Sequence, residues 1–191
     1  MMSNVVLYLH GFASSSASEK AQLTARYFAE CLPQYRLVIP DLPYTPAEAV
    51  ATIANCLADC KPVAVIGSSL GGFFATRVAL AYGCPAALIN PAVKPATLLD
   101  RHLGEYYHPV LQRTYQLTAD HLPMLHALTP TRPSASDQIL VLLQQGDEVL
   151  DYHDALDFYQ YCHLDVQEGG DHSYQGYAKR LPDIVKFCQL A

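Results

Sequence analysis

Short runs of apolar residues recur along the chain, separated by mixed or polar stretches. The runs are continuous rather than alternating, which predicts buried strands at 5–9, 36–39, 62–66, 86–89, 138–143 and 164–167. The stretches between them carry apolar residues at helical spacing and predict helices near 19–31, 46–60, 73–82, 152–161 and 176–188. Strands that alternate with helices are typical of an α/β fold, here a doubly wound, mainly parallel six-stranded sheet.

Residues 91–137 interrupt this alternation because they are longer than a simple crossover between two strands. They contain three tyrosines, four histidines and several leucines. Long insertions at the active edge of a sheet often form lids, so we expect a helical cap there. An ordinary helical excursion packed on the core is the alternative. No repeat or second domain boundary is evident, so residues 1–191 are predicted to form a single domain.

Composition narrows the functional classes. The chain has 191 residues, 51% of them hydrophobic and 16% charged, with a net charge of −6. A mildly acidic surface argues against nucleic acid as a partner, because phosphate binding needs a basic face. No apolar run is long enough to cross a membrane, and residues 1–5 lack a basic signal-peptide start. We therefore expect a cytoplasmic protein. The six scattered cysteines lack metal-ligand spacing, so we expect no metal.

The strongest chemical motif is Gly67-x-Ser69-x-Gly71, which follows one predicted strand and opens the next helix. Strand before and helix after is the setting of a nucleophile elbow, a sharp turn that presents a serine at the sheet edge. Glycines two residues away on either side leave room for such a turn. Ser69 is the candidate nucleophile, and Ser68 is in the wrong register. The alternative is a tight turn with a capping serine.

A serine nucleophile needs a base, and the base needs an acid that orients it. Asp147 directly follows the fifth strand and His172 the sixth, so both are expected at the same sheet edge as Ser69. The chain order Ser, acid, His is that of α/β-hydrolases. Asp151 and Glu148 remain alternative acids, because both lie in the same loop or the helix after it.

The loop after the first strand, His10-Gly11-Phe12, is placed to supply an oxyanion donor. The backbone N–H groups of Phe12 and Leu70 are the candidates. Loss of one such donor typically costs roughly 10² to 10³ in rate. His10 itself is expected to brace the loop rather than to transfer protons.

Four motifs together carry a family resemblance: Leu9-His10-Gly11-Phe12, the elbow at 67–72, the acid loop at 145–151 and Gly169-Gly170-Asp171-His172-Ser173. With these motifs the whole chain resembles the YqiA-type esterases, a small bacterial branch of the α/β-hydrolases. The resemblance implies a compact α/β-hydrolase fold and carboxylesterase activity, with acyl-CoA thioesters as further candidate substrates. By motif, the nucleophile falls on Ser69, the acid on Asp147 and the base on His172. The chain departs from larger hydrolases at the acid loop, because they usually place extra residues where Gly146 precedes Asp147 here.

These observations predict a serine hydrolase that cleaves carboxylic esters or thioesters, with short to medium acyl groups and no cofactor. The expected partner is a small acyl ester or thioester, and the expected assembly a monomer or weak homodimer. A catalytically weak hydrolase-fold protein that serves as a binding module is the alternative. Peptide or C–C bond hydrolysis by the same residues is a third reading.

Overall fold

Six parallel strands form the central sheet of the computed structural model, which describes residues 4–135 and 137–190. Their spatial order is β2 (Arg36–Val38), β1 (Val5–Leu9), β3 (Ala64–Ser68), β4 (Ala86–Ile89), β7 (Ile139–Gln144) and β8 (His163–Gln167). The order confirms the predicted doubly wound sheet. Residues 1–3 lie outside the described residues, and they are part of the start on which the expectation of no signal peptide rests. Ser136 and Ala191 also lie outside the described residues.

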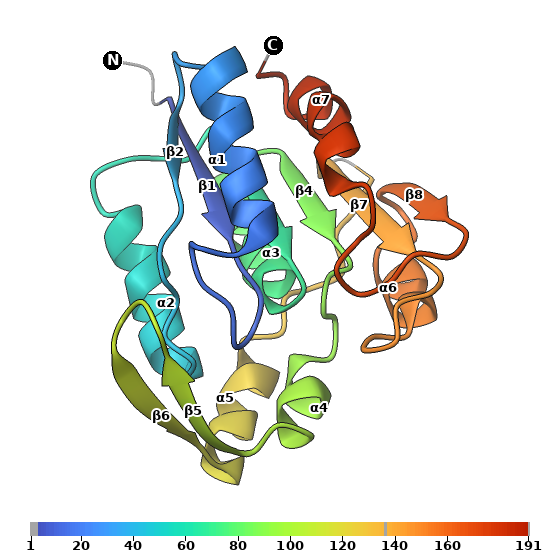
Figure 1. Ribbon diagram of the computed structural model, residues 1–191. Helices are drawn as coiled ribbons and strands as arrows, with labels where there is room; N and C mark the ends of the chain where they lie inside the picture. The colour runs from blue at the N-terminus through green and yellow to red at the C-terminus, as the bar shows by residue number, and fades with distance from the viewer. Residues whose placement is uncertain (1–3, 136, 191) are drawn as a thin grey trace.

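Helices cover both faces of this sheet (Figure 1). Two of them, α1 (Glu19–Cys31) and α7 (Tyr177–Phe187), pack on one face, where their apolar residues meet Val6 and Tyr8 of β1. The opposite face packs against three helices: α2 (Pro46–Cys56), α3 (Leu70–Tyr82) and α6 (Tyr152–Phe158). The central strands are therefore apolar on both sides, which explains why their sequences read as continuous hydrophobic runs.

The strand order reverses at β1, because β2 lies on one side of it and β3 on the other. Open α/β sheets bind ligands beside such a switch point, at the carboxyl ends of the strands. Leu9 of β1 is paired with Gly67 of β3, so the loops after these two strands begin side by side. This pairing brings the segment after Leu9 next to the turn that holds Ser69.

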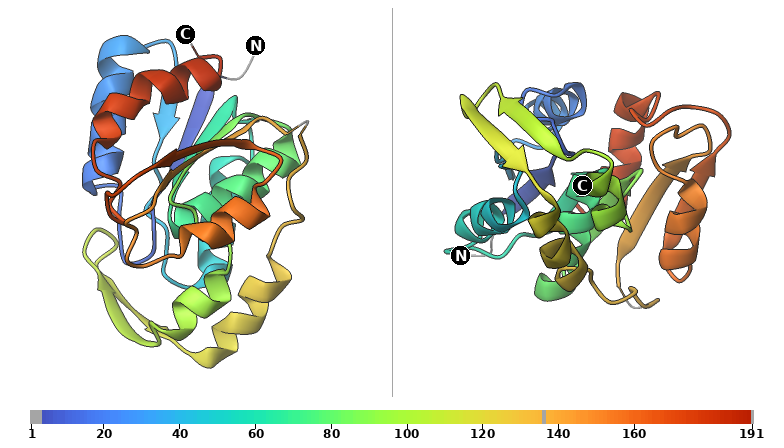
Figure 2. Two further views of the ribbon diagram at one scale, coloured as in Figure 1. Left: turned by 90° about the vertical axis from the view of Figure 1, so that its right-hand side faces the viewer. Right: turned by 90° about the horizontal axis from the view of Figure 1, so that it is seen from below.

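The helices and strands of the predicted cap, residues 95–127, lie beyond the carboxyl ends of the sheet strands, and we call them the cap segment (Figures 1 and 2). It is not purely helical. An antiparallel hairpin, β5 (Gly104–His108) and β6 (Arg113–Leu117), follows α4 (Pro95–Asp100) and precedes η1 (Ala119–His121) and α5 (Leu122–Ala127). The hairpin buries alternate side chains, with His108, Tyr115 and Leu117 turned inward. The segment therefore packs on the sheet edge through both helices and strands.

Among the described residues, no helix is both long enough and apolar enough to span a bilayer.

Candidate active site

Ser69 lies in the sharp turn between β3 and α3. Its φ of 54° falls in the left-handed region, and it is the residue that immediately precedes α3. The flanking glycines allow close backbone contacts at this turn. A Cβ on Gly67 would lie 2.4 Å from the Gly71 carbonyl oxygen, and a Cβ on Gly71 would lie 2.0 Å from that of Leu9. Only glycine fits at either position without a shift of backbone, and the strained turn is characteristic of a functional serine.

A continuous chain of hydrogen bonds links Ser69, His172 and Asp147. His172 Nε2 lies 3.0 Å from Ser69 Oγ, and its Nδ1 lies 2.8 Å from Asp147 Oδ2. The distances suit a base that accepts the serine proton and an acid that orients the imidazole. Glu148 takes a different position, because its Oε2 accepts the backbone N–H of His172 at 3.0 Å.

The carboxylate of Asp147 is almost fully buried, with its side chain 2% exposed. Its Oδ1 also accepts the backbone N–H groups of Val149 and Leu150 at 2.9 and 2.8 Å. These donors hold the carboxylate in one orientation toward His172. Asp151, the alternative acid, is exposed and caps α6, where it accepts both the backbone N–H and Nδ1 of His153.

Two buried amide side chains hold the loop that carries His172. Asn90 Nδ2 donates to the carbonyl oxygens of Asp171 and His172, at 3.0 and 3.3 Å. Gln144 Oε1 accepts the backbone N–H groups of Asp171 and Gln175, and its Nε2 donates to the Gln175 carbonyl. Asn90 Oδ1 in turn accepts the Gln144 backbone N–H. We call Asn90 and Gln144 the amide clamp. The clamp was not predicted from the sequence, although a polar residue at the end of each of two buried strands was a signal for it.

The candidate oxyanion donors lie where β1 and β3 end. The backbone of Gly11 passes so close to the nucleophile that a Cβ there would lie 3.6 Å from Ser69 Oγ. Among the described residues, no acceptor takes the backbone N–H of Phe12 or of Leu70. Both donors are therefore free for a ligand, and Leu70 adds the positive end of the α3 dipole.

His10 braces this loop from behind. Its Nδ1 donates to the Gly11 carbonyl and its Nε2 accepts the Leu42 backbone N–H, both at 2.9 Å. Burial lowers the pKa of His10, which keeps the ring neutral. The side-chain atoms of His10, Asp41 and His108 that could bind a metal ion lie within 4.8 Å of one another. Because both nitrogens of His10 are already hydrogen-bonded, the arrangement suits a structural brace better than a metal centre.

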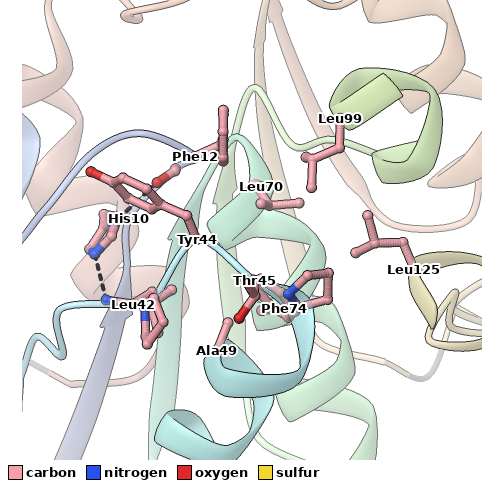
Figure 3. Close-up of a pocket in the computed structure, with 13 residues that line it drawn as sticks. His10, Phe12, Leu42, Tyr44, Thr45, Ala49, Leu70, Phe74, Leu99 and Leu125 are labelled. Carbon is pink, nitrogen blue, oxygen red and sulfur yellow. Dashed lines mark hydrogen bonds between the residues drawn. The ribbon is translucent and has the colours of Figure 1, made fainter. Parts of the chain in front are cut away.

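Two clefts meet at Phe12. The first, which we call the apolar cleft, has a volume of about 310 Å³ including its solvent-open part. Figure 3 shows Leu99 of α4 and Leu125 of α5 extending toward Leu70, so the cap segment forms one wall. The second, the polar cleft, has a corresponding volume of about 710 Å³. Ser69 and His172 line the polar cleft together with Ser14, Ser18, Lys20 and Ser173.

Comparison with known proteins gives a family match and a set of structural neighbours. The profile of UPF0227, described as an uncharacterised protein family, matches residues 5–189. A UPF0227 protein of Shewanella woodyi is 28% identical over 192 residues, which covers 96% of this chain and 98% of that protein.

The structural neighbours are α/β-hydrolases. The esterase domain of a Rhodothermus marinus protein is 18% identical with a TM-score of 0.68, covering 98% of this chain and 87% of the other. Mouse alpha/beta hydrolase domain-containing protein 10 is 16% identical with a TM-score of 0.67, covering 95% and 88%. At these identities the likeness establishes the fold.

Proposed function

The chain belongs to the UPF0227 family, which includes the YqiA-type esterases, and from that premise we propose that it is a serine hydrolase of carboxylic esters or thioesters. One observation carries the proposal. Ser69 Oγ, both nitrogens of His172 and the buried carboxylate of Asp147 form a single hydrogen-bonded chain. Three residues far apart in the sequence meet in this way at the sheet edge where the fold places ligands.

The geometry supports a two-stage reaction. His172 Nε2 accepts the Ser69 proton while Oγ bonds to the acyl carbon, and the Phe12 and Leu70 N–H groups hold the oxyanion. The C–O or C–S bond then breaks, and His172 returns the proton to the leaving alcohol or thiol. In the second stage His172 deprotonates a water that attacks the acyl-enzyme, and Ser69 regains its proton as the carboxylic acid departs.

The apolar cleft is the natural site for the acyl chain. It borders Phe12 and Leu70, the proposed oxyanion donors, and its walls are mainly aliphatic and aromatic. The cleft is narrow, because only about 10 Å³ of its space is wide enough for a water molecule. These features favour short to medium acyl groups.

The test is turnover of 4-nitrophenyl butyrate and butyryl-CoA by the wild type, Ser69→Ala and Ser68→Ala. Ser68 is the neighbouring serine at the end of β3, so it is a matched control. We expect Ser69→Ala to lose nearly all turnover and Ser68→Ala to keep most of it. No turnover of any ester or thioester by the wild type would favour the alternative of a binding module.

A further inference from the structure

Lys20 places a positive charge in the polar cleft beside the candidate nucleophile. It lies in the first turn of α1, and its side chain lines the same cleft as Ser69 and His172. The protein as a whole is acidic, with a net charge of −6. The positive charge of Lys20 is therefore opposite in sign to the net charge of the protein.

The ammonium group of Lys20 is only partly satisfied. Its Nζ donates to the Ser173 carbonyl oxygen at 2.9 Å, and a lysine has three donors. No carboxylate among residues 4–135 and 137–190 forms an ion pair with it. Burial lowers the pKa of Lys20, and the nearby carboxylates of Glu19, Asp171 and Asp147 oppose that shift. An anion in the cleft would find at least one unused donor.

The rest of the polar cleft is suited to a hydrophilic group. Hydroxyl side chains of Ser14, Ser18 and Ser173 line it, and the Ser18 side chain makes no capping bond to α1. Of the described residues that line it, Glu19 alone carries a carboxylate, and it is exposed to solvent. Hydroxyls and an ammonium group together can solvate a carboxylate or a phosphate.

The position of His172 decides which part of the substrate enters this cleft. His172 must hand its proton to the leaving oxygen or sulfur, so the leaving group lies on its side of Ser69. His172 and Ser173 line the polar cleft and not the apolar one. The acyl chain and the leaving group thus have separate clefts, which meet at Phe12.

We propose that Lys20 is a specificity-determining residue that selects esters or thioesters whose alcohol or thiol portion carries an anionic group, a carboxylate or a phosphate. The inference rests on the proposed hydrolase function, and it names the chemistry of the leaving group, which that function leaves open. Lys20 acts on binding, while bond cleavage remains with Ser69, His172 and Asp147.

The experiment compares two butyrate esters of nearly equal shape, 3-carboxyphenyl butyrate and its neutral amide, 3-carbamoylphenyl butyrate. For the wild type we expect kcat/KM about tenfold higher on the anionic ester, the scale of one charge-assisted hydrogen bond partly screened by water. Lys20→Met should bring the ratio of the two kcat/KM values close to one, mainly through a higher KM for the anionic ester. Lys20→Arg keeps the charge and should keep most of the preference. Lys61 precedes β3, at the amino end of the strand whose other end leads to Ser69. Lys61→Met therefore removes an equal charge far from the polar cleft and should leave the ratio unchanged.

Three results would overturn the inference, and each has a different signature. Equal kcat/KM of the wild type on both esters would remove the selectivity while leaving the hydrolase function intact. A Lys20→Met variant with lower kcat on both esters and an unchanged ratio would show that Lys20 only supports the His172 loop through Ser173. No hydrolysis of either ester by the wild type would overturn the proposed function together with the inference.

Discussion

Replacement of Gln144 by methionine tests whether the amide clamp positions His172. The Gln144 side chain is buried, and it makes four hydrogen bonds: two accepted from Asp171 and Gln175 and two donated to Gln167 and Gln175. Methionine has a similar length and volume but cannot make these bonds. Gln144→Met therefore removes the polar contacts while the core stays filled.

The expected cost follows from these bonds. A net contribution of about 0.5–1.5 kcal/mol for each bond, partly recovered from water on the half-exposed loop, gives a loss of about 2–4 kcal/mol in the free energy of unfolding. His172 would also lose its fixed distance to Ser69, and misplacement by about 1 Å can reduce rate by about 10². We expect kcat to fall by at least about tenfold. Urea denaturation measures the stability, and ester hydrolysis measures kcat and KM.

Gln167→Met is the matched control, because it removes one of the four bonds and leaves those to the His172 loop. It should lose about 1 kcal/mol of stability and keep most of kcat. A folded Gln144→Met variant with wild-type kcat would refute the view that the clamp positions the base.

Three further predictions concern the acid, the acyl cleft and the buried histidines. Asp147→Asn should lower kcat by about 10³ to 10⁴ without unfolding, whereas Asp151→Asn should stay near wild type; the reverse in an ester assay would reassign the acid. Leu125→Ala should raise kcat/KM for octanoate esters relative to butyrate, and an unchanged preference would place the acyl chain elsewhere. Burial lowers the pKa of His10 and His108, so unfolding takes up protons below about pH 6.5. The free energy of unfolding from urea titration should therefore fall from pH 7 to pH 5, with a smaller slope in His108→Phe; an equal slope would contradict this cause.

The sheet could be predicted from the sequence because its strands are buried on both faces. Continuous apolar runs are a local signal, so the strands could be found one by one. Ser69, Asp147 and His172 each follow such a strand, so their place at one edge of the sheet could be predicted as well. The boundaries shifted slightly: α3 begins at Leu70, directly after the nucleophile, and α2 ends at Cys56. A nucleophile elbow requires the helix to begin at the residue after the serine. A hydrophobic pattern does not locate the first residue of a helix that closely.

The hairpin in the cap segment and the amide clamp were harder to predict from the sequence. Tyr115 and Leu117 do alternate with polar residues, a strand signal of period two, but the helical cap was expected from the length and position of the insertion. The clamp depends on hydrogen bonds between Asn90 and residues 81 and 82 positions later in the chain. Such long-range bonds leave no local pattern, although polar Asn90 and Gln144 at the ends of buried strands mark the positions.

The central claim is that Ser69 is a nucleophile activated by His172. The most direct test is reaction with a fluorophosphonate probe, followed by mass spectrometry of the intact protein and its peptides. We predict one adduct for each wild-type chain, located on Ser69, no adduct on Ser69→Ala and strongly slowed labelling of His172→Ala. An adduct that survives in Ser69→Ala, or one that maps to another residue of the wild type, would contradict the claim.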